Sequence, residues 1–167
     1  GRGLSGTGPK AGGPLYIGRL VQVPPVPPQH SSVHIQPAVL DFAQWLRGKG
    51  KSELSDLARD FGSNSALGLD LELPGPVGEK NLYALHPRGR ILLAPATEEG
   101  LLVQLGAVFA TGNRAVVDAL SGLQSALAGL PASLAALISW SSDWAADGPY
   151  AGALIERDAD RGVEGTR

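Results

Sequence analysis

The sequence predicts an α/β fold, with a mostly parallel sheet flanked by helices, preceded by a loop-strand segment and two short helices. From Leu82 onward, short apolar runs alternate with stretches of helical periodicity, which is the pattern of parallel strands joined through helices. Before that point, a proline-rich stretch, Pro24–Pro28, separates a glycine-rich beginning from two segments of helical spacing.

Composition excludes several classes of protein. The chain has 167 residues, of which 43% are hydrophobic and 18% charged, as in a globular domain. A net charge of -2 without a cluster of Lys and Arg argues against nucleic acid or a membrane surface as a partner. The absence of cysteine excludes disulfides, thiolate metal sites and a cysteine nucleophile. No apolar run is long enough for a signal peptide or a membrane span.

The glycine-rich beginning matches two phosphate-binding patterns only superficially. Gly1, Gly3 and Gly6 have the spacing of the dinucleotide fingerprint, but no strand precedes them. A phosphate loop over residues 3–10 is rejected because Pro9 precedes the lysine and Ala11 stands where a Ser or Thr would hold magnesium. On composition alone this stretch would be a surface turn.

The first half of the chain should contain one strand and two helices. Leu15–Val23 alternates like a strand, and residues 24–37 form a linker whose end, Ser32–Ile35, is an edge strand or extended chain. Pro37 then begins a helix that runs to Gly48. Ser52 caps a second helix, which stops at Gly62. Residues 62–81 are expected to be a loop.

The second half should build the sheet. Strands are expected at Leu82–Leu85 and Arg90–Ala94, separated by a turn over residues 86–89. Thr97 should cap a helix that ends at Gly112, with Glu98 and Glu99 favouring its dipole. The apolar face of this helix should consist of Leu101, Leu102, Leu105, Val108 and Phe109.

After this helix the alternation continues. A short buried strand is expected at Ala115–Val117, followed by helices near residues 121–127 and 132–138 and a strand at Tyr150–Ile155. Residues 158–161 would open the next helix. The expected elements therefore alternate between strand and helix to the end of the sheet.

Single polar and aromatic residues mostly have structural explanations. The histidines lack acidic neighbours at metal-ligand spacing and are assigned structural or solvent roles; they are His30, His34 and His86. Asp158 and Asp160 would form an acid and base pair only in a cleft that raised one pKa, so capping or solvation is preferred. The tryptophans are assigned to core or interface packing; they are Trp45, Trp140 and Trp144.

The segment GLSGTGPKAGGPLYIGRL, residues 3–20, closely resembles a loop and strand of aldehyde dehydrogenases that act on L-glutamate γ-semialdehyde. It is most similar to the bifunctional proline utilization A flavoenzymes of bacteria. In that family the loop is the aldehyde anchor, which binds the α-carboxylate of the substrate. The resemblance implies that Ser5 and the amides near Leu4 and Gly6 bind the substrate carboxylate.

Two further segments resemble the same family: LPGPVGEKNLYALHPRGRILLAP, residues 73–95, and EEGLLVQLGAVFATGNRAVV, residues 98–117. In long members these belong to an extra C-terminal domain with an aldehyde dehydrogenase-like fold and no active site. The implied organisation is residues 1–23 as the end of the dehydrogenase module, 24–37 as a linker, and 38–167 as this non-catalytic domain. Its Rossmann-like sheet should be incomplete, since the later family strands are missing.

The resemblance also implies what the parent enzyme does. The family oxidises proline with FAD and then oxidises glutamate semialdehyde with NAD, in the cytoplasm. This segment would contribute the anchor loop and a domain that helps to cover the internal tunnel for the intermediate. Without a cysteine it would be inactive alone, with no catalytic residue, cofactor or metal of its own. Its partners would be the other domains of the parent polypeptide, and a homo-oligomer is possible.

Two alternatives stay open at the sequence level. The chain could be an independent α/β binding or oligomerisation module without a catalytic parent. It could also be an autonomous dinucleotide-binding domain, which would bind NAD saturably. We expect no such binding, because no glycine fingerprint follows a strand from Leu82 onward.

Overall fold

The computed structural model describes residues 35–73, 78 and 80–156, of which 71–73 are described by their backbone alone. The helices and strands in chain order are α1 (Pro37–Gly48), α2 (Ser52–Asn64), β1 (Asp70–Leu73), β2 (Asn81–Ala84), β3 (Arg90–Ala94), α3 (Glu98–Ala110), β4 (Arg114–Asp118), the 3-10 turns η3 (Ala119–Ser121) and η4 (Leu123–Leu127), α4 (Ala132–Ala135), β5 (Ile138–Ser141) and β6 (Gly152–Ile155).

The main sheet has four parallel strands in the order β5-β4-β3-β6. The chain passes from β3 through α3 to β4, and it returns to the other side of β3 only with β6. Leu92 in the middle of β3 lies opposite Val116 of β4 and Ala153 of β6. The predicted α/β fold with a parallel sheet flanked by helices is therefore confirmed.

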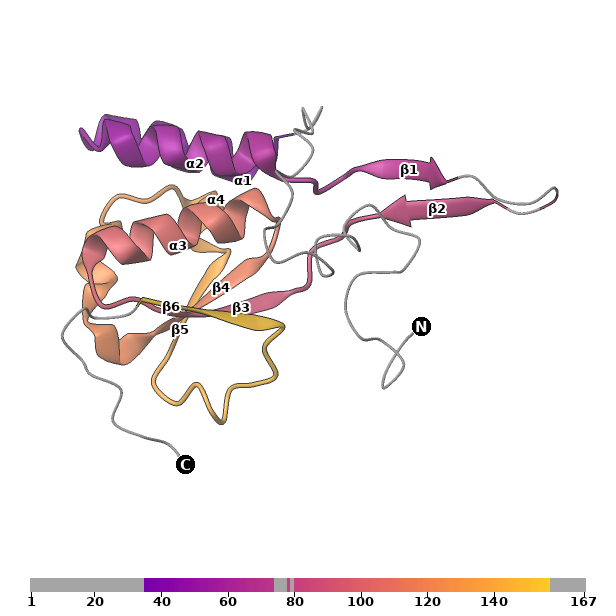
Figure 1. Ribbon diagram of the computed structural model, residues 1–167. Helices are drawn as coiled ribbons and strands as arrows, with labels where there is room; N and C mark the ends of the chain where they lie inside the picture. The colour runs from indigo at the N-terminus through magenta and orange to yellow at the C-terminus, as the bar shows by residue number, and fades with distance from the viewer. Residues whose placement is uncertain (1–34, 74–77, 79, 157–167) are drawn as a thin grey trace, which may run out of the picture.

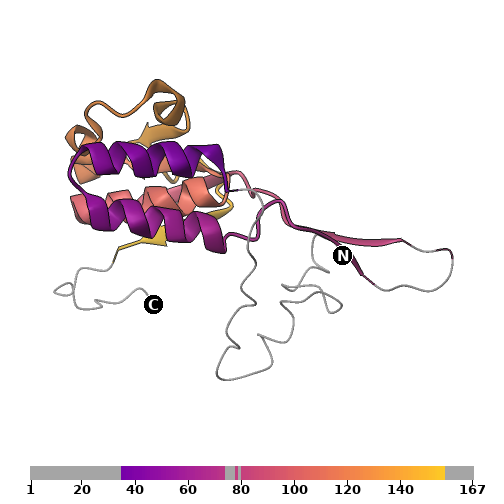
Figure 2. The same cartoon turned by 90° about the horizontal axis from the view of Figure 1, so that it is seen from above.

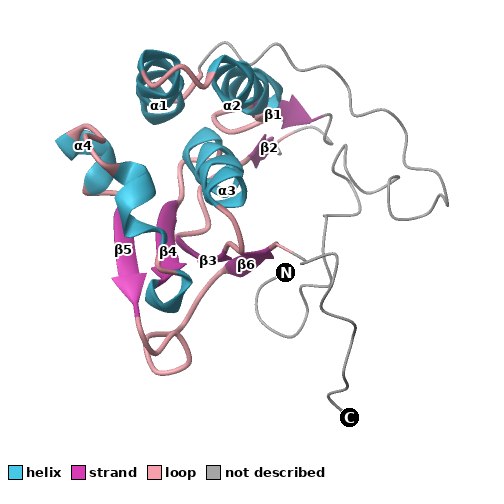
Figure 3. Ribbon diagram, turned by 90° about the vertical axis from the view of Figure 1, so that its left-hand side faces the viewer, coloured by secondary structure: helices cyan, strands magenta, loops and turns pink. Residues whose placement is uncertain are grey.

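The helices cover one face of this sheet in two layers. Figure 1 and Figure 3 show α3 directly on the strands, with α1 and α2 lying over α3. The opposite face is covered by the segment between β5 and β6, which passes beneath the sheet in Figure 1. Because side chains alternate along a strand, Leu93 and Val117 join the core under α3, whereas Leu92 and Val116 face this segment.

Helix α3 is buried on several sides at once, because it lies between the sheet and the other helices. All five apolar residues predicted for its buried face are buried: Leu101, Leu102, Leu105, Val108 and Phe109. Phe109 meets Phe42 of α1 edge to face, with 5.2 Å between the ring centroids. A helix that is apolar all round is stable only in such a position.

Helices α1 and α2 form a pair joined by a short turn, and Figure 2 shows them side by side. Pro37 starts α1 as predicted, where its missing N–H is not needed. Ser52 is not the predicted cap of α2: it is the first helical residue, Lys51 precedes it, and no side chain caps this end. The helix continues through Gly62 to Asn64.

The region before β6 differs most from the prediction. The helix expected near residues 121–127 is two 3-10 turns, and the helix expected over 132–138 ends at Ala135. Ile138 instead begins β5, a strand that was not predicted. Its serines alternate with Ile138 and Trp140, so one face packs on the core and the other is polar. The Leu- and Ala-rich residues before it hid this change from helical to strand period.

The expected loop over residues 62–81 contains a second missed strand, β1, which pairs antiparallel with β2 from Asp70 opposite Ala84 to Leu73 opposite Asn81. Figures 1 and 2 show this hairpin as an arm that extends away from the helices and the main sheet. We call Asp70–Ala84 the arm. Acidic residues at alternate positions of β1 gave it a polar composition typical of a loop.

Candidate functional site

The predicted aldehyde anchor, Leu4, Ser5 and Gly6, lies outside the described residues, as do Asp158 and Asp160 and the histidines His30 and His34. The anchor therefore stays a prediction. His86 lies exposed between β2 and β3. In the part of the chain that the structure describes, no three His, Asp or Glu side chains gather as a metal site. None of the helices described is long and apolar enough to cross a membrane.

The most organised polar site lies where β3 and β6 end and α3 begins. Glu156, directly after β6, is held to β3 by its own amide, which donates to the Ala94 carbonyl at 3.1 Å. Its carboxylate accepts hydrogen bonds from the amides of Ala96, at 2.8 Å, and Thr97, at 3.0 Å. The Thr97 hydroxyl donates to the second carboxylate oxygen at 2.7 Å.

Thr97 also caps α3 as predicted. Its Oγ1 accepts a hydrogen bond from the Gly100 amide at 2.9 Å, while its own proton goes to Glu156. One hydroxyl therefore joins the cap of the helix to the carboxylate. The amides at the start of a helix carry partial positive charge, so an ionised carboxylate is favoured at this position.

Gly100 makes this approach possible. A Cβ built on Gly100 would lie 1.8 Å from a carboxylate oxygen of Glu156, far inside contact distance. Any larger residue at this position of α3 would displace the carboxylate. Hydrogen bonding lowers the pKa of Glu156, chiefly through the Thr97 hydroxyl and with help from the amides of Thr97 and Ala96, against a partial desolvation that raises it.

The location of this site matters for its chemistry. In open α/β sheets, ligands bind outside the carboxyl ends of the strands where the strand order reverses, with phosphates at the start of a helix. Here β4 and β6 lie on opposite sides of β3, so the order reverses beside β3. At this edge of the sheet, the amides just before α3 donate to the Glu156 carboxylate.

Sequence reasoning missed Glu156. It was not a candidate because its partners lie about sixty positions earlier in the chain. A signal was nonetheless present: a carboxylate directly follows an apolar strand, and a capped helix earlier in the chain carries glycine in its first turn. Only the pairing of β6 with β3 connects these two observations.

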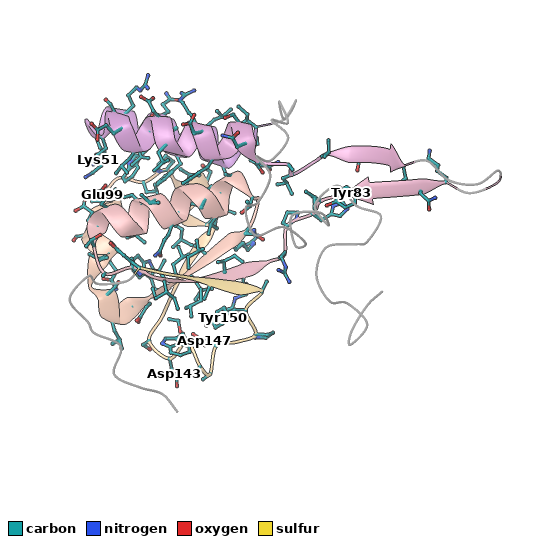
Figure 4. All side chains as sticks on the ribbon, in the orientation of Figure 1. Lys51, Tyr83, Glu99, Asp143, Asp147 and Tyr150 are labelled. Atoms are coloured by element: carbon teal, nitrogen blue, oxygen red, sulfur yellow. The ribbon has the colours of Figure 1, made fainter. Side chains whose placement is uncertain are left out.

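A second polar group lies beneath the sheet. Figure 4 shows Asp143, Asp147 and Tyr150 on the face away from the helices. The Arg90 guanidinium lies over the Tyr150 ring, 5.2 Å from its centroid, and donates to the Asp147 carbonyl at 2.7 Å. Ser141 is buried and its hydroxyl donates to the Asp147 carboxylate. These contacts fasten the β5–β6 segment to the sheet.

The hollows in the described part of the molecule include the following two. One, of about 510 Å³, is lined by Gly50, Lys51, Ser52, Glu53, Leu54, Leu57 and Glu99. Lys51 pairs with Glu98 at 2.8 Å, and Lys51 and Glu99 lie at the same end of the helices in Figure 4. The other, of about 170 Å³, is lined mainly by apolar residues around Trp140. Neither brings together side chains for catalysis.

The tryptophans divide between core and surface. Trp45 stacks on Phe42 with 5.7 Å between ring centroids, and its Nε1 donates to the Gly129 carbonyl at 2.9 Å. Trp140 packs against the core. Trp144 is 49% exposed, so core packing does not account for it.

The geometry defines an α/β domain in which a carboxylate of the same chain, Glu156, is bound at the start of α3. No family model matches the chain. Among curated proteins it is 68% identical over 161 residues to the bifunctional protein PutA of Rhizobium meliloti, which covers 96% of this chain and 13% of that protein. It is 32% identical over 177 residues to PutA of Salmonella typhimurium, again over 96% of this chain.

A match to PutA of Escherichia coli K12 has 37% identity and covers 68% of this chain and 10% of that protein. The chain is a segment of the PutA family, as its resemblance to proline utilization A implied. It spans 13% of the length of the first two relatives.

Proposed function

We propose that the chain is the C-terminal segment of a bifunctional enzyme that oxidises proline to glutamate through pyrroline-5-carboxylate. The observation that supports this best is the 68% identity to a bifunctional PutA over 96% of the chain. The parent would use FAD for the first oxidation and NAD for the second, in the cytoplasm. The partners of the segment would be the other domains of the parent.

Within this proposal, the segment has two tasks. Leu4, Ser5 and Gly6 anchor the carboxylate of glutamate semialdehyde, and residues 38–167 form a non-catalytic domain that covers the tunnel of the intermediate. The segment cannot supply the cysteine nucleophile of an aldehyde dehydrogenase, because it has no cysteine. Nor does it bind a dinucleotide, a view supported by the carboxylate of Glu156 at the start of α3.

The anchor is tested by Ser5→Ala in the parent enzyme. Loss of a hydrogen bond to a charged substrate group should raise the KM for pyrroline-5-carboxylate about ten- to hundredfold. An aldehyde without a carboxylate, such as butanal, is the matched control, and its KM should not change. Equal effects on both aldehydes would assign Ser5 to the fold of the loop instead.

The covering role is tested by deleting residues 38–167 from the parent. Oxidation of proline should then form NADH only after a lag, because the intermediate escapes into solution before it reaches the second site. Both half-reactions, assayed separately with saturating substrates, should continue. Formation of NADH without a lag in a deletion variant that keeps both activities would contradict this role.

Inactivity of the segment is tested directly. The 167-residue chain is incubated with pyrroline-5-carboxylate and NAD, and NADH is followed by absorbance. No NADH is expected. Turnover would show that the missing cysteine is not decisive.

A further inference from the structure

Few contacts hold the edge strand β6 on the main sheet. This strand has four residues, and within the described residues its only strand neighbour is β3. Leu154 packs against the core, but Ile155 is 71% exposed. Short strands with one neighbour and little buried apolar surface open readily in native proteins. An additional contact at the end of β6 therefore stabilises the position of this strand more than it would stabilise a central strand.

The contact that ends β6 is more elaborate than a strand end requires. Three donors from Ala96 and Thr97 converge on the Glu156 carboxylate, and the chain reaches them only because β6 lies parallel beside β3. Gly100 leaves the space that the carboxylate occupies. These three features depend on one another, because a side chain at position 100 or loss of the carboxylate at 156 removes the same set of bonds.

The neighbouring carboxylates do not share this arrangement. Glu98 and Glu99 also lie in the first turn of α3. Glu98 pairs with Lys51 at the side that faces α2, and Glu99 is exposed. A general preference of the helix for negative charge is thus available to all three acids. Convergent hydrogen bonds to the amides of Ala96 and Thr97 distinguish Glu156.

We propose that Glu156 acts as a built-in ligand of the cradle formed by Ala96, Thr97 and Gly100, and that this contact locks β6 onto the sheet. The cradle is the type that holds a phosphate in related architectures, but here it holds the end of a strand. The hydrogen bonds that would hold a bound anion at this position instead hold the end of β6, and we call this contact the latch. The pairing of β6 with β3 and the occupation of the cradle by Glu156 should therefore be gained and lost together.

The experiment is amide hydrogen exchange of the intact protein, followed at the resolution of short peptides. Glu156→Ala and Gly100→Ala should each speed exchange about tenfold or more in peptides that cover 95–100 and 152–156. Glu99→Gln is the matched control, since it removes a charge from the same helix end. It should change exchange in these peptides less than about twofold.

Chemical rescue separates a ligand from a packing contact. Acetate added to the Glu156→Ala protein should occupy the vacated cradle and restore protection of the 95–100 peptide, whereas chloride at equal ionic strength should not. Free acetate is not attached to β6, so the 152–156 peptide should stay unprotected. Protection of the 152–156 peptide by acetate would overturn the proposal, because β6 would then be held without its connection to the bound carboxylate. Fast exchange of both peptides at every acetate concentration would overturn it too, because the cradle would then not bind a carboxylate.

Two further results would decide the matter if Glu156→Ala does not fold. Glu156→Gln keeps the length of the side chain and one acceptor oxygen, so exchange should rise in both peptides, about threefold. Protection in β6 that is unchanged in both Glu156→Gln and Gly100→Ala would overturn the latch. Faster exchange only in the 95–100 peptide would also overturn it, because the cap would then act on α3 alone.

Discussion

At the scale of single residues, the clearest feature is how buried polar groups connect separate helices. Ser55 of α2 is fully buried, and its hydroxyl donates to the Ala43 carbonyl of α1 at 2.8 Å. Most buried hydroxyls in proteins have such a partner, because an unpaired one loses its hydrogen bonds to water without replacement. The two helices therefore meet through a specific bond as well as through apolar contact.

Replacing Ser55 tests this bond. Ser55→Ala should lower the free energy of unfolding by about 1 kcal/mol, the usual net value of a buried hydrogen bond. Urea unfolding followed by circular dichroism measures the change. Ser133→Ala, at an exposed helical position, is the control and should stay within about 0.5 kcal/mol of the wild type. Equal effects of the two replacements would contradict the role of the bond.

The Glu156 carboxylate gives a second test at this scale, through pH. Its pKa lies below the ordinary value of 4.5 because of hydrogen bonds from Thr97 and Ala96. A group with a lowered pKa in the folded state stabilises the protein above its unfolded pKa, and this stabilisation is lost as pH falls through the folded pKa. Thermal unfolding between about pH 3 and pH 6 should therefore show a loss of stability on the acid side.

Glu156→Gln should flatten this part of the profile. Three charged groups share the site, Glu98, Glu99 and Lys51, and the Lys51 to Glu98 pair remains in the variant. Glu99→Gln is the control, and its profile should keep the acid-side loss. A variant at 156 with the wild-type slope would show that the carboxylate contributes no proton linkage.

At the scale of elements, α3 places two glycines in opposite surroundings. A Cβ on Gly106 would lie 3.5 Å from the Ala58 Cβ, an ordinary contact between α3 and α2. A Cβ on Gly100 would overlap the Glu156 carboxylate. Intrinsic helix propensity favours alanine equally at both positions, so any difference between them comes from their surroundings.

This contrast predicts opposite signs for one substitution. Gly106→Ala should raise the free energy of unfolding by roughly 0.5 to 1 kcal/mol, because alanine loses less conformational freedom in a helix. Gly100→Ala should lower it. Denaturant unfolding of both variants under the same conditions makes the comparison. Equal stabilisation by both alanines would mean that the carboxylate is not held as described.

Elements with a clear local signal were predictable, and those set by distant partners were not. The sequence around α3 carries a cap, acidic residues in the first turn and an apolar pattern, so its start was predicted correctly at Thr97. Strand β5 becomes a strand because β4 lies beside it, from Ala115 opposite Ile138. Strand β1 depends in the same way on β2. Glu156 was missed for this reason too, since the partners of its carboxylate lie in the connection between β3 and α3.

At the scale of the whole molecule, the helices and the sheet share one core. Phe42 and Leu46 of α1, Leu105 of α3 and Val117 of β4 belong to the same buried cluster. Such a cluster should unfold as a unit.

A comparison of probes tests this unity. Tryptophan fluorescence reports mainly on Trp45 and Trp140, which pack against the core, and circular dichroism reports on the helices. The two urea transitions should coincide. The exposed Trp144 is removed as Trp144→Phe in a control variant, and this should leave the free energy of unfolding unchanged within about 0.5 kcal/mol. Two separate transitions would show that the helical layers and the sheet unfold independently, which would contradict the prediction.

The arm extends away from the core that the helices and the main sheet share. At its base, the Gly68 amide donates to the Leu85 carbonyl at 3.5 Å, so the two ends of the excursion are joined before the chain enters the sheet. Because the arm is closed at its base, a change in the structure of the arm should have little effect on the main sheet. A change in the length of the arm should therefore leave the register of the main sheet unaltered.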